Sequence, residues 1–281
     1  MSATARITGT TRLYAIIGDP IAQVRSPEVF TERLAKAGVD AVLLPVHVPA
    51  AQFEVAVPGL LSLGNLDGVL VTVPFKARMV PFAARLGEGA RVIGAINALR
   101  READGSWTGD MFDGKGFVNA AMAKGARLQG ASVLLFGAGG AGSAIACALA
   151  EAGTSAIDII DPERDRCDSL IAKLSAAFAH CRFAAADAHR SAYDLVINAS
   201  PVGMGATDGM PGEIGRLAPG TLVGDVVVSQ EPTRLIRHAL ASGCVCVTGR
   251  DMHAGQVDAI MAFFGHGSPP FPSAGASTRS H

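Results

Sequence analysis

The sequence predicts an α/β protein built from parallel sheets that are covered by helices. Short apolar strand patterns alternate with helical apolar stripes from residue 13 onward, as is typical of sheets whose crossovers are helices. A glycine-rich turn follows the apolar run 132–136, and the alternation starts again after it. A chain of 281 residues is long enough for two modest domains. We therefore expect two α/β domains with a cleft between them.

The first half of the chain predicts a β-α-β-α-β unit. Strands are expected at 13–17, 41–46 and 68–73, and helices at about 26–37 and 49–63. Ser26 and Pro27 predict a helix start, because serine caps helices and proline fits the first turn. Since ligands bind at the carboxyl ends of parallel strands, the loops 19–26 and 72–76 are candidate binding segments.

Three polar side chains of this half stand at unusual places. Lys76 follows the apolar residues 73–75, which predicts a partly desolvated ammonium able to exchange a proton; an exposed lysine in a first helical turn is the alternative. Asn97 lies inside an apolar run, so its amide either ties down backbone or faces a ligand. Asp113 precedes a helix that is expected to reach residue 123, and helix capping alone would account for it.

A glycine motif divides the chain. The strand 132–136 and a helix at 143–152 flank a G-x-G-x-x-G pattern, made by Gly137, Gly139 and Gly142. Its glycines turn the chain, let backbone approach a pyrophosphate and let the helix sit close, while the helix N-terminus faces the phosphates. A second apolar run, 156–160, ends in Asp161, where an acid that bonds a ribose is expected. We predict a Rossmann dinucleotide-binding domain; a turn that binds nothing is the alternative.

The rest of the chain continues the alternation. Helices are expected at 162–178, 233–242 and 254–264, and strands near 182–184, 195–199, 222–227 and 244–247. The segment 198–204 turns from a strand end into a Gly/Met loop, the position that faces the nicotinamide in a doubly wound sheet. An ordinary connecting loop is the alternative. From residue 265 the chain is rich in Gly, Ser and Pro, which predicts disorder.

The composition limits the kinds of partner. With 24 basic and 25 acidic residues, the chain carries no electrostatic footprint for nucleic acid or an anionic membrane. No stretch approaches the ~20 apolar residues that span a bilayer. The five cysteines are scattered without C-x-x-C spacing, which disfavours disulfides and structural zinc. We expect a cytoplasmic protein with small-molecule partners and no metal, and a monomer or homodimer.

Several segments, taken in order, resemble the shikimate dehydrogenase family. They are Gly-Asp-Pro-Ile-Ala-Gln-Val-Arg-Ser-Pro at 18–27, Val-Thr-Val-Pro-Phe-Lys at 71–76, Gly-Ala-Ile-Asn at 94–97, Asp-Gly-Lys-Gly at 113–116, the glycine loop 137–143, Asn-Ala-Ser-Pro-Val-Gly-Met at 198–204, and the segments 225–235 and 252–256. Each is modest alone, but together they cover about residues 13–264. The resemblance implies reversible oxidation of shikimate to 3-dehydroshikimate with a nicotinamide cofactor, and a role in aromatic amino acid biosynthesis. Quinate or another ring hydroxy acid is an alternative substrate, and a non-catalytic nucleotide-binding relative is an alternative of another class.

The resemblance also implies a set of site residues. Its catalytic pair is Lys76 and Asp113, in which the lysine takes the hydroxyl proton and the carboxylate holds the lysine. The positions that match substrate contacts are Ser26, Thr72, Asn97 and Gln256. The positions that match cofactor contacts are Gly137, Ala138, Gly139, Gly140, Ala141, Gly142, Asp161, Arg166, Asn198, Ser200, Val226 and Gly249.

The chain departs from the family pattern near the substrate. Where the family has a serine, a tyrosine, an asparagine and a threonine, this sequence has Val24, Val228, Met111 and Phe112. Two expected donors to a substrate carboxylate are thereby lost, and Arg25 is a candidate substitute. We therefore expect a divergent member of the family.

The cofactor preference also departs from that of NADP-using members. Asp161 pairs with a ribose 2′-hydroxyl and repels a 2′-phosphate, and Glu163 and Asp165 add to that repulsion. Arg164 and Arg166 offset part of it, so NAD is expected and NADP is the alternative.

The resemblance divides the chain into domains as follows. Residues 12–112 and 249–265 form a substrate and catalytic domain, 113–248 form the dinucleotide-binding domain, and 266–281 form a disordered tail. The return at residue 249 follows from Gln256, which as a substrate contact has to reach the same cleft as Lys76.

Overall fold

The computed structural model describes residues 7–186, 192–204, 209–214, 217–229 and 231–267. The chain forms two compact units. Within the described ranges, the first comprises residues 7–112 and 257–267, and the second comprises residues 113–256. The unit boundary near the C-terminus thus falls after Gln256, whereas the sequence placed a domain boundary at residue 249; the domain assignment stays a prediction. The expected disorder of the tail concerns residues that lie, from 268 onward, outside the described part of the chain.

The first unit contains a six-stranded sheet of order β2-β1-β3-β5-β6-β4. Its strands are β1 (Arg12–Gly18), β2 (Ala41–His47), β3 (Leu66–Val71), β4 (Arg85–Leu86), β5 (Ala98–Arg101) and β6 (Trp107–Asp110). The parallel register sets Ile17 of β1 opposite Val46 of β2 and Val71 of β3, so these three strands end together. The loops that follow them therefore leave the same edge of the sheet.

A hairpin of β5 and β6 makes this sheet mixed. β5 and β6 are antiparallel, and Gly105 in the turn between them has a φ of 81°, a backbone conformation that glycine adopts readily. β5 also pairs antiparallel with β3. The candidate binding segments thus follow β1 and β3, which belong with β2 to the parallel part of this sheet.

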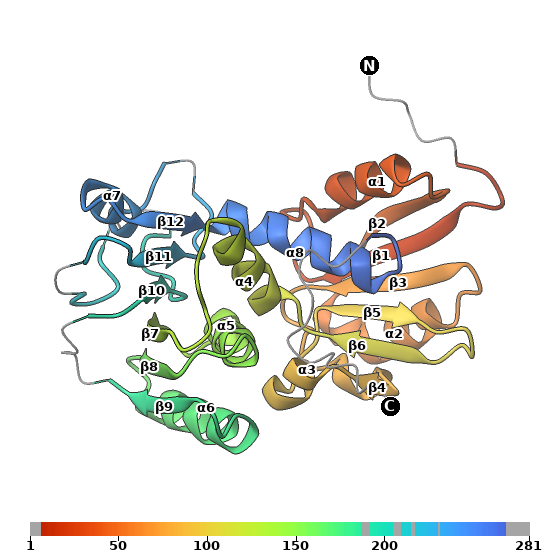
Figure 1. Ribbon diagram of the computed structural model, residues 1–281. Helices are drawn as coiled ribbons and strands as arrows, with labels where there is room; N and C mark the ends of the chain where they lie inside the picture. Colours follow the sequence, from red (N-terminus) through yellow and green to blue (C-terminus); the bar gives the residue numbers. More distant parts are fainter. Residues whose placement is uncertain (1–6, 187–191, 205–208, 215–216, 230, 268–281) are drawn as a thin grey trace, which may run out of the picture. The chain divides into compact units, whose positions relative to one another are not determined.

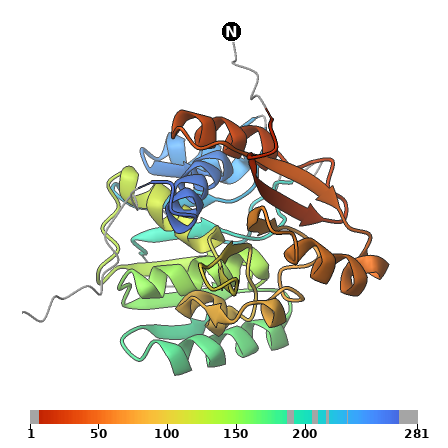
Figure 2. The same ribbon diagram turned by 90° about the vertical axis from the view of Figure 1, so that its right-hand side faces the viewer.

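Helical segments cover the sheet of the first unit. They are α1 (Ser26–Lys36), the 3₁₀ turn η1 (Ala50–Gln52), α2 (Phe53–Leu61), the 3₁₀ turn η2 (Val80–Phe82) and α3 (Glu88–Ile93). α1 packs against β2, as both views of the ribbon show (Figures 1 and 2). The N-cap of α1 is Arg25 and no side chain caps this helix, so the prediction that Ser26 is the cap was wrong. Pro27 instead occupies the first turn, where it needs no hydrogen-bond partner for its nitrogen.

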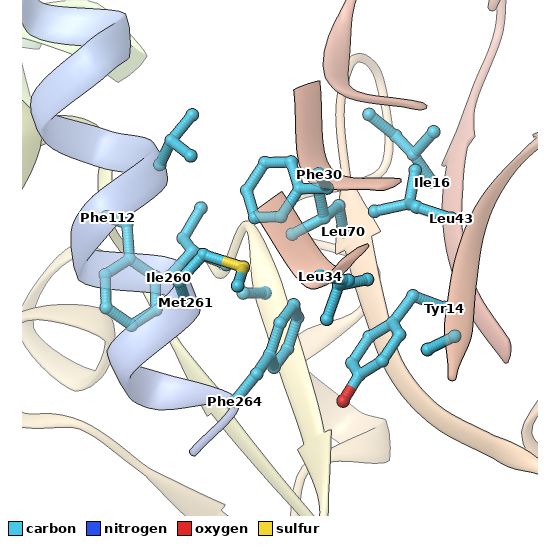
Figure 3. Packing of buried hydrophobic residues seen from close by; sticks show 13 residues of the cluster. Tyr14, Ile16, Phe30, Leu34, Leu43, Leu70, Phe112, Ile260, Met261 and Phe264 are labelled. Carbon is cyan, nitrogen blue, oxygen red and sulfur yellow. The ribbon is translucent and has the colours of Figure 1, made fainter. Parts of the chain in front are cut away.

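The core of the first unit joins its N-terminal strands to the end of the chain. Figure 3 shows Phe30 and Leu34 of α1 beside Ile260 and Met261 of α8 (Gly249–Phe263). The ring of Phe264, just after α8, lies 4.8 Å from that of Tyr14 between centroids. The last residues of α8 therefore belong to the apolar core of strands formed near the N-terminus.

The second unit contains a fully parallel sheet of order β12-β11-β10-β7-β8-β9. Its strands are β7 (Ser132–Phe136), β8 (Ala156–Ile160), β9 (Arg182–Ala185), β10 (Leu195–Asn198), β11 (Leu222–Asp225) and β12 (Val245–Thr248). This is the doubly wound order of a Rossmann domain, and its strand order reverses between β7 and β10. Ligands bind outside the carboxyl ends of the strands at such a reversal.

The helices of the second unit are α4 (Asp113–Ala123), α5 (Gly140–Glu151), α6 (Arg164–Ala177), α7 (Arg234–Ala241) and the first half of α8. α5 and α6 lie alongside β7 to β9 (Figures 1 and 2). α4 packs closely on α5 because Gly114 has no side chain: a Cβ there would overlap the carbonyl oxygen of Ala144. The first glycine of the Asp-Gly-Lys-Gly motif is thus needed for helix packing.

The start of α8 is fixed by a reciprocal pair of hydrogen bonds. The backbone N–H of Thr248 donates to Oδ2 of Asp251 at 2.8 Å, and the N–H of Asp251 donates to Oγ1 of Thr248 at 3.3 Å. This capping box satisfies two otherwise unpaired donors of the first turn. Consequently α8 begins at Gly249, and the prediction of a start at residue 254 was wrong.

Candidate active site

In the first unit, two loops at the carboxyl edge of the sheet are bonded to each other. The N–H of Asp19 donates to the carbonyl of Val73 at 3.0 Å, and the N–H of Thr72 donates to the carbonyl of Ile17 at 3.0 Å. Gly18 permits this approach, because a Cβ on it would overlap Cγ2 of Thr72. The segments that carry Ser26 and Thr72 are therefore held in a defined arrangement.

Lys76 stands on a turn that is anchored on both sides. Phe75 before it and Met79 after it are fully buried. The Phe75 ring packs on Phe53 with centroids 4.7 Å apart, and the backbone carbonyl of Lys76 accepts a hydrogen bond from Ile96 N at 3.0 Å. Lys76 itself is half-buried. The core thus fixes the backbone of Lys76, whereas its side chain is only partly removed from solvent.

Asn97 is buried and bonds to the backbone. Its side-chain Oδ1 accepts a hydrogen bond from the backbone N–H of Phe112 at 2.8 Å, and the backbone N–H of Asn97 donates to the carbonyl of Asp110 at 3.0 Å. Of the two expectations for this amide, the tie to neighbouring backbone is what the structure contains. That tie fixes the end of the chain segment that leads to Asp113. A contact between Asn97 and a substrate stays a prediction.

The segments around the predicted substrate positions are more apolar than the family pattern implies. Val24 packs against the core cluster of the first unit, and Met111 and Phe112 are both buried. Ser26 is half-buried at the first position of α1. Arg25, the candidate substitute for the missing donors, is exposed and forms a 3.1 Å ion pair with Glu28.

In the second unit, Asp113 is held by a residue far away in sequence. Nε2 of Gln256 on α8 donates to Oδ1 of Asp113 at 2.7 Å. The close crossing of α4 and α8 depends on glycines: a Cβ on Gly116 would lie 2.6 Å from the carbonyl oxygen of Met252, and one on Gly255 would lie 2.5 Å from that of Gly116. Asp113 and Gln256 were both predicted as site residues, but no local sequence pattern predicted the hydrogen bond between them.

His253, one turn before Gln256, was missed in the sequence. Its Nε2 is buried and has no hydrogen-bond partner among the residues that the structure describes. Burial lowers the pKa of His253, while a side-chain hydrogen bond with Gln256 and the charge of Asp113 act to raise it. The i, i+3 spacing from Gln256 on a helix was a signal for their proximity, but only once α8 was known to begin at Gly249.

The glycine loop has the geometry that phosphate binding requires. Gly137 has a φ of 99°, and a Cβ there would lie 2.8 Å from the carbonyl oxygen of Ala199. A Cβ on Gly142 would overlap the carbonyl oxygen of Gly137, so only glycine lets α5 start this close to β7. At Gly139 and Gly140 a Cβ would meet nothing within 4 Å, so their outer side is open. The N-terminus of α5, which contains Ala141, therefore presents bare backbone.

Asp161 is tied to this loop directly. Its Oδ2 accepts from the N–H of Ala138 at 2.7 Å and its Oδ1 from the N–H of Glu163 at 2.8 Å. Arg166 approaches the same carboxylate at 3.6 Å and also pairs with Glu163. The Asp161 side chain is only 3% exposed. The acid at the end of β8 thus supports the glycine loop as well as standing where a ribose is expected.

The loop after β10 is organised by a buried network. Asn198 donates from Nδ2 to the carbonyl of Val202 and to Oδ1 of Asp225, and its Oδ1 accepts from Oγ of Ser200 at 2.6 Å. Thr233 donates to Oδ2 of Asp225 at 2.6 Å. Burial raises the pKa of Asp225, and these hydrogen bonds oppose that shift. The bonds give Asn198 and Ser200 a structural role, and their contact with a cofactor stays a prediction.

Val226 and Gly249 meet at the adjoining strand end. The N–H of Val226 donates to the carbonyl of Asn198 at 3.0 Å, and a Cβ on Gly249 would lie 2.5 Å from the carbonyl oxygen of Val226. Val228, where a tyrosine was expected, is 66% exposed. The predicted cofactor positions of the second unit thus surround the carboxyl ends of β7, β8, β10 and β11.

Two further observations concern the described ranges. No helix there is both long and apolar enough to cross a bilayer. Nor does that part of the chain bring three or more His, Cys, Asp or Glu side chains together as metal ligands.

Comparisons with known proteins agree with the geometry of both units. The family model described as "Shikimate dehydrogenase substrate binding domain" matches residues 16–99. A protein named shikimate dehydrogenase (NADP(+)) from Geobacter metallireducens is 33% identical over 272 residues, which are 94% of each chain. A protein of the same name from Rubrobacter xylanophilus is 36% identical over 252 residues, 88% of each chain.

The solved structures that share this fold are named for more than one enzymatic activity. Shikimate 5-dehydrogenase of Listeria monocytogenes, in complex with shikimate and NAD, has a TM-score of 0.86 and 28% identity, covering 95% of this chain and 96% of its own. A 5-ketofructose reductase of Gluconobacter has a TM-score of 0.84 and 27% identity, covering 90% and 92%. Quinate dehydrogenase of Corynebacterium glutamicum, in complex with NAD, has a TM-score of 0.81 and 28% identity, covering 90% and 93%.

Proposed function

Because the chain belongs to the shikimate dehydrogenase family, we propose that this NAD(P)-dependent oxidoreductase interconverts shikimate and 3-dehydroshikimate. The observation that carries the proposal is 33% identity to a shikimate dehydrogenase along 94% of the chain. The doubly wound second unit with its open glycine loop supports a dinucleotide cofactor. Hydride passes between the ring carbon that bears the hydroxyl and the nicotinamide, so the protein has to move one proton at the hydroxyl oxygen.

In this proposal Lys76 and Asp113 move that proton. Oxidation removes hydride from carbon, and the hydroxyl proton passes to Nζ of Lys76 acting as general base. The Asp113 carboxylate orients the ammonium that forms and shares its charge. The anchored backbone of Lys76 and the 2.7 Å bond from Gln256 to Asp113 support these roles, because each group is held by its own unit before substrate binds.

The remaining assigned residues orient the two ligands. Ser26, Thr72, Asn97 and Gln256 are proposed to hydrogen-bond the ring hydroxyls or the carboxylate. Residues 137–142 are proposed to cradle the pyrophosphate at the N-terminus of α5, with Asn198, Ser200, Val226 and Gly249 toward the nicotinamide. Residues 12–112 and 249–265 are proposed as the substrate domain, and 113–248 as the cofactor domain.

We propose NAD as the preferred cofactor, with NADP as the alternative. The curated relatives are named for NADP, whereas two of the structural neighbours hold NAD. The preference for NAD follows from the segment after β8. Two backbone N–H groups fix the Asp161 carboxylate there, and Glu163 adds a second carboxylate, which pairs with Arg166. A 2′-phosphate would meet both carboxylates, relieved in part by Arg166. The test is kcat/KM for NAD and for NADP at one salt concentration, and a preference for NADP would overturn the assignment.

The alternative substrates differ in whether they carry a carboxylate. The apolar packing of Val24 and the valine at position 228 remove two hydroxyl donors from the expected carboxylate site. That observation favours a substrate without a carboxylate, such as the ketose named for the Gluconobacter neighbour, whereas quinate and other ring hydroxy acids, which carry a carboxylate as shikimate does, stay alternatives. NADH formation from shikimate and quinate, and NADH oxidation with 3-dehydroshikimate and 5-ketofructose, separate these candidates. Tight NADH binding without turnover of any of them would favour the non-catalytic reading.

A further inference from the structure

A closed ring of hydrogen bonds in the first unit encloses the lysine turn, residues 73–78. The backbone N–H of Asp19 donates to the carbonyl of Val73, at the start of this turn, at 3.0 Å. Oδ2 of Asp19 accepts from the backbone N–H of Ala50 at 2.9 Å. The carbonyl of Ala50 in turn accepts from Nη1 of Arg78, at the end of the turn, at 3.1 Å. The two ends of the lysine turn are thus fastened to two residues that already hold each other.

Both oxygens of the Asp19 carboxylate have donors. Besides the N–H of Ala50 on Oδ2, Nε2 of His47 at the end of β2 lies 3.0 Å from Oδ1. The hydrogen bond with His47, and after it the one with Ala50, hold the pKa of Asp19 below its usual value. The group that closes the ring is therefore a carboxylate anion, which accepts from both partners.

Arg78 closes the ring from the other side. Its guanidinium carbon lies 4.0 Å from the centre of the Phe53 ring and 5.6 Å from that of Phe75, and its Nη2 pairs with Glu54 at 2.9 Å. A guanidinium that stacks on aromatic faces and donates to fixed acceptors is ordered by them. Because Phe75 directly precedes Lys76, Arg78 braces the residue next to the proposed general base.

We propose that Asp19 and Arg78 are positioning residues, which orient Lys76 for proton transfer by closing this ring around the lysine turn. The inference rests on the proposed role of Lys76 as proton acceptor. A general base has to stand within hydrogen-bond reach of the proton that it takes, and a misplacement of ~1 Å can cost a factor of about 100 in rate.

The exposure of the ring decides where its loss would be felt. The side chains of Asp19 and His47 are 32% and 55% exposed, and exposed ion pairs contribute little to the stability of a fold. Opening the ring should therefore disturb the placement of the lysine turn more than the stability of the first unit. A merely structural role would show the opposite pattern.

Two substitutions of Asp19 test the ring by kinetics. Asp19→Ala removes the acceptor of Ala50 and His47, whereas Asp19→Asn keeps an oxygen for Ala50 and an N–H for the other tautomer of His47. We expect Asp19→Ala to lower kcat roughly three- to tenfold, the loss of one oriented hydrogen bond, and Asp19→Asn to restore about half of the wild-type kcat or more. The Kd for NADH should stay within about twofold, because the proposed cofactor positions lie in the second unit.

The control for Asp19→Ala is Glu32→Ala, which breaks an exposed ion pair with Lys36 on α1 and should leave kcat unchanged. An Asp19→Ala variant that folds, by circular dichroism and thermal unfolding, and keeps the wild-type kcat would overturn the inference.

A double-mutant cycle tests whether Asp19 and Arg78 act together. Arg78→Leu keeps an apolar cover over Phe53 and removes the donor to Ala50. Since either substitution opens the same ring, the double variant should lose about as much kcat as the more affected single variant. Losses that multiply in the double variant would mean that the two residues act separately, and the ring would be refuted.

Hydrogen exchange of the free protein tests the ring without turnover. In Asp19→Ala the backbone amides of residues 71–79 should exchange roughly tenfold faster, as local opening becomes easier by one hydrogen bond, while peptides from the second unit exchange as before. Unchanged exchange in residues 71–79 would refute the ring even if the enzyme acts on shikimate. Faster exchange there, in a protein whose wild type does not turn over shikimate, would uphold the ring and refute the proposed function.

Discussion

Gln256 and Asp113 are 143 positions apart in sequence, yet a 2.7 Å hydrogen bond from Nε2 to Oδ1 joins them across α8 and α4. The bond gives the carboxylate a donor on one oxygen and a fixed direction. Because this carboxylate is already ordered before substrate binds, it is suited to orient a second charged group.

The first prediction concerns the proposed catalytic pair. Lys76→Ala removes the proton acceptor, and Asp113→Asn replaces the carboxylate with an amide that faces the N–H of Gln256. Each should reduce kcat by about 10²- to 10⁴-fold, the usual contribution of general acid-base catalysis. The Kd for NADH should change less than threefold. Steady-state kinetics and NADH fluorescence give the two values, with the exposed Lys173→Ala as the charge-matched control. Near wild-type kcat in either variant would show that its assigned role is wrong.

The second prediction concerns the acid at the end of β8. Asp161→Ala removes the proposed ribose partner and also the acceptor of the Ala138 N–H, so the glycine loop loses a support. We expect kcat/KM for NAD to fall about ten- to a hundredfold, the value of a charge-assisted hydrogen bond, and kcat/KM for NADP to fall much less. Asp168→Ala, at an exposed position further along α6, is the control and should change neither value much. A loss that is equal for both cofactors would mean that Asp161 serves only the loop.

The third prediction concerns the crossing of α4 and α8. Gly116→Ala places a Cβ 2.6 Å from the Met252 carbonyl oxygen and 2.8 Å from Cβ of Gln256, and backbone on both sides cannot yield easily. The free energy of unfolding should fall by about 1–3 kcal/mol, as overpacking usually costs. Gly59→Ala in α2 is the matched control, because its Cβ meets nothing within 4 Å, and it should be neutral or stabilise by about 0.4–1 kcal/mol. Urea unfolding measures both, and equal stabilities would contradict the close crossing.

The fourth prediction concerns the capping box of α8. Burial acts to raise the pKa of Asp251, but hydrogen bonds from Lys124 and Thr248 prevail and hold it below its usual value. A depressed carboxyl pKa contributes stability above the unfolded pKa of about 3.9, and that contribution is lost as the pH falls through the folded value. Asp251→Asn should therefore lower the free energy of unfolding by about 0.5–2 kcal/mol at pH 7.

The pH dependence is the sharper part of this test. The difference between wild type and Asp251→Asn should shrink below pH about 4, where wild-type Asp251 becomes protonated as well. Asp168→Asn, at an exposed position of α6, controls for the charge change. A difference that stays constant from pH 7 to pH 3 would exclude ionisation of Asp251 as its source.

The sequence predicted most reliably what is local and apolar. The limits of β7 and β8 match the apolar runs 132–136 and 156–160 residue for residue, because both strands are buried and end at glycine or aspartate. The glycine loop followed from the spacing of its glycines between an expected strand and an expected helix. Motifs that depend on three or four neighbouring residues therefore transfer well from sequence to structure.

What the sequence missed depends on contacts between distant segments or on reciprocal side-chain bonds. Ser26 was expected to cap α1, but a serine that precedes a proline fits inside the first turn as well as before it, and only the backbone decides. The start of α8 was placed too late because Thr248 and Asp251 cap each other across an ordinary-looking segment. His253 gave no signal until α8 placed it one turn from Gln256.

The division of α8 between two units has a consequence for the order in which the protein forms during translation. Its last turns supply Ile260 and Met261 to the core built around Phe30, and Phe264 covers Tyr14. The ribosome makes Tyr14 and Phe30 early, but it makes their partners only after all of Asp113–Gln256 has been synthesised. Domains of most proteins mature from the N-terminus first. Here the nascent first unit keeps an incomplete core until residues 257–264 have been made, and the second unit has all its described strands beforehand.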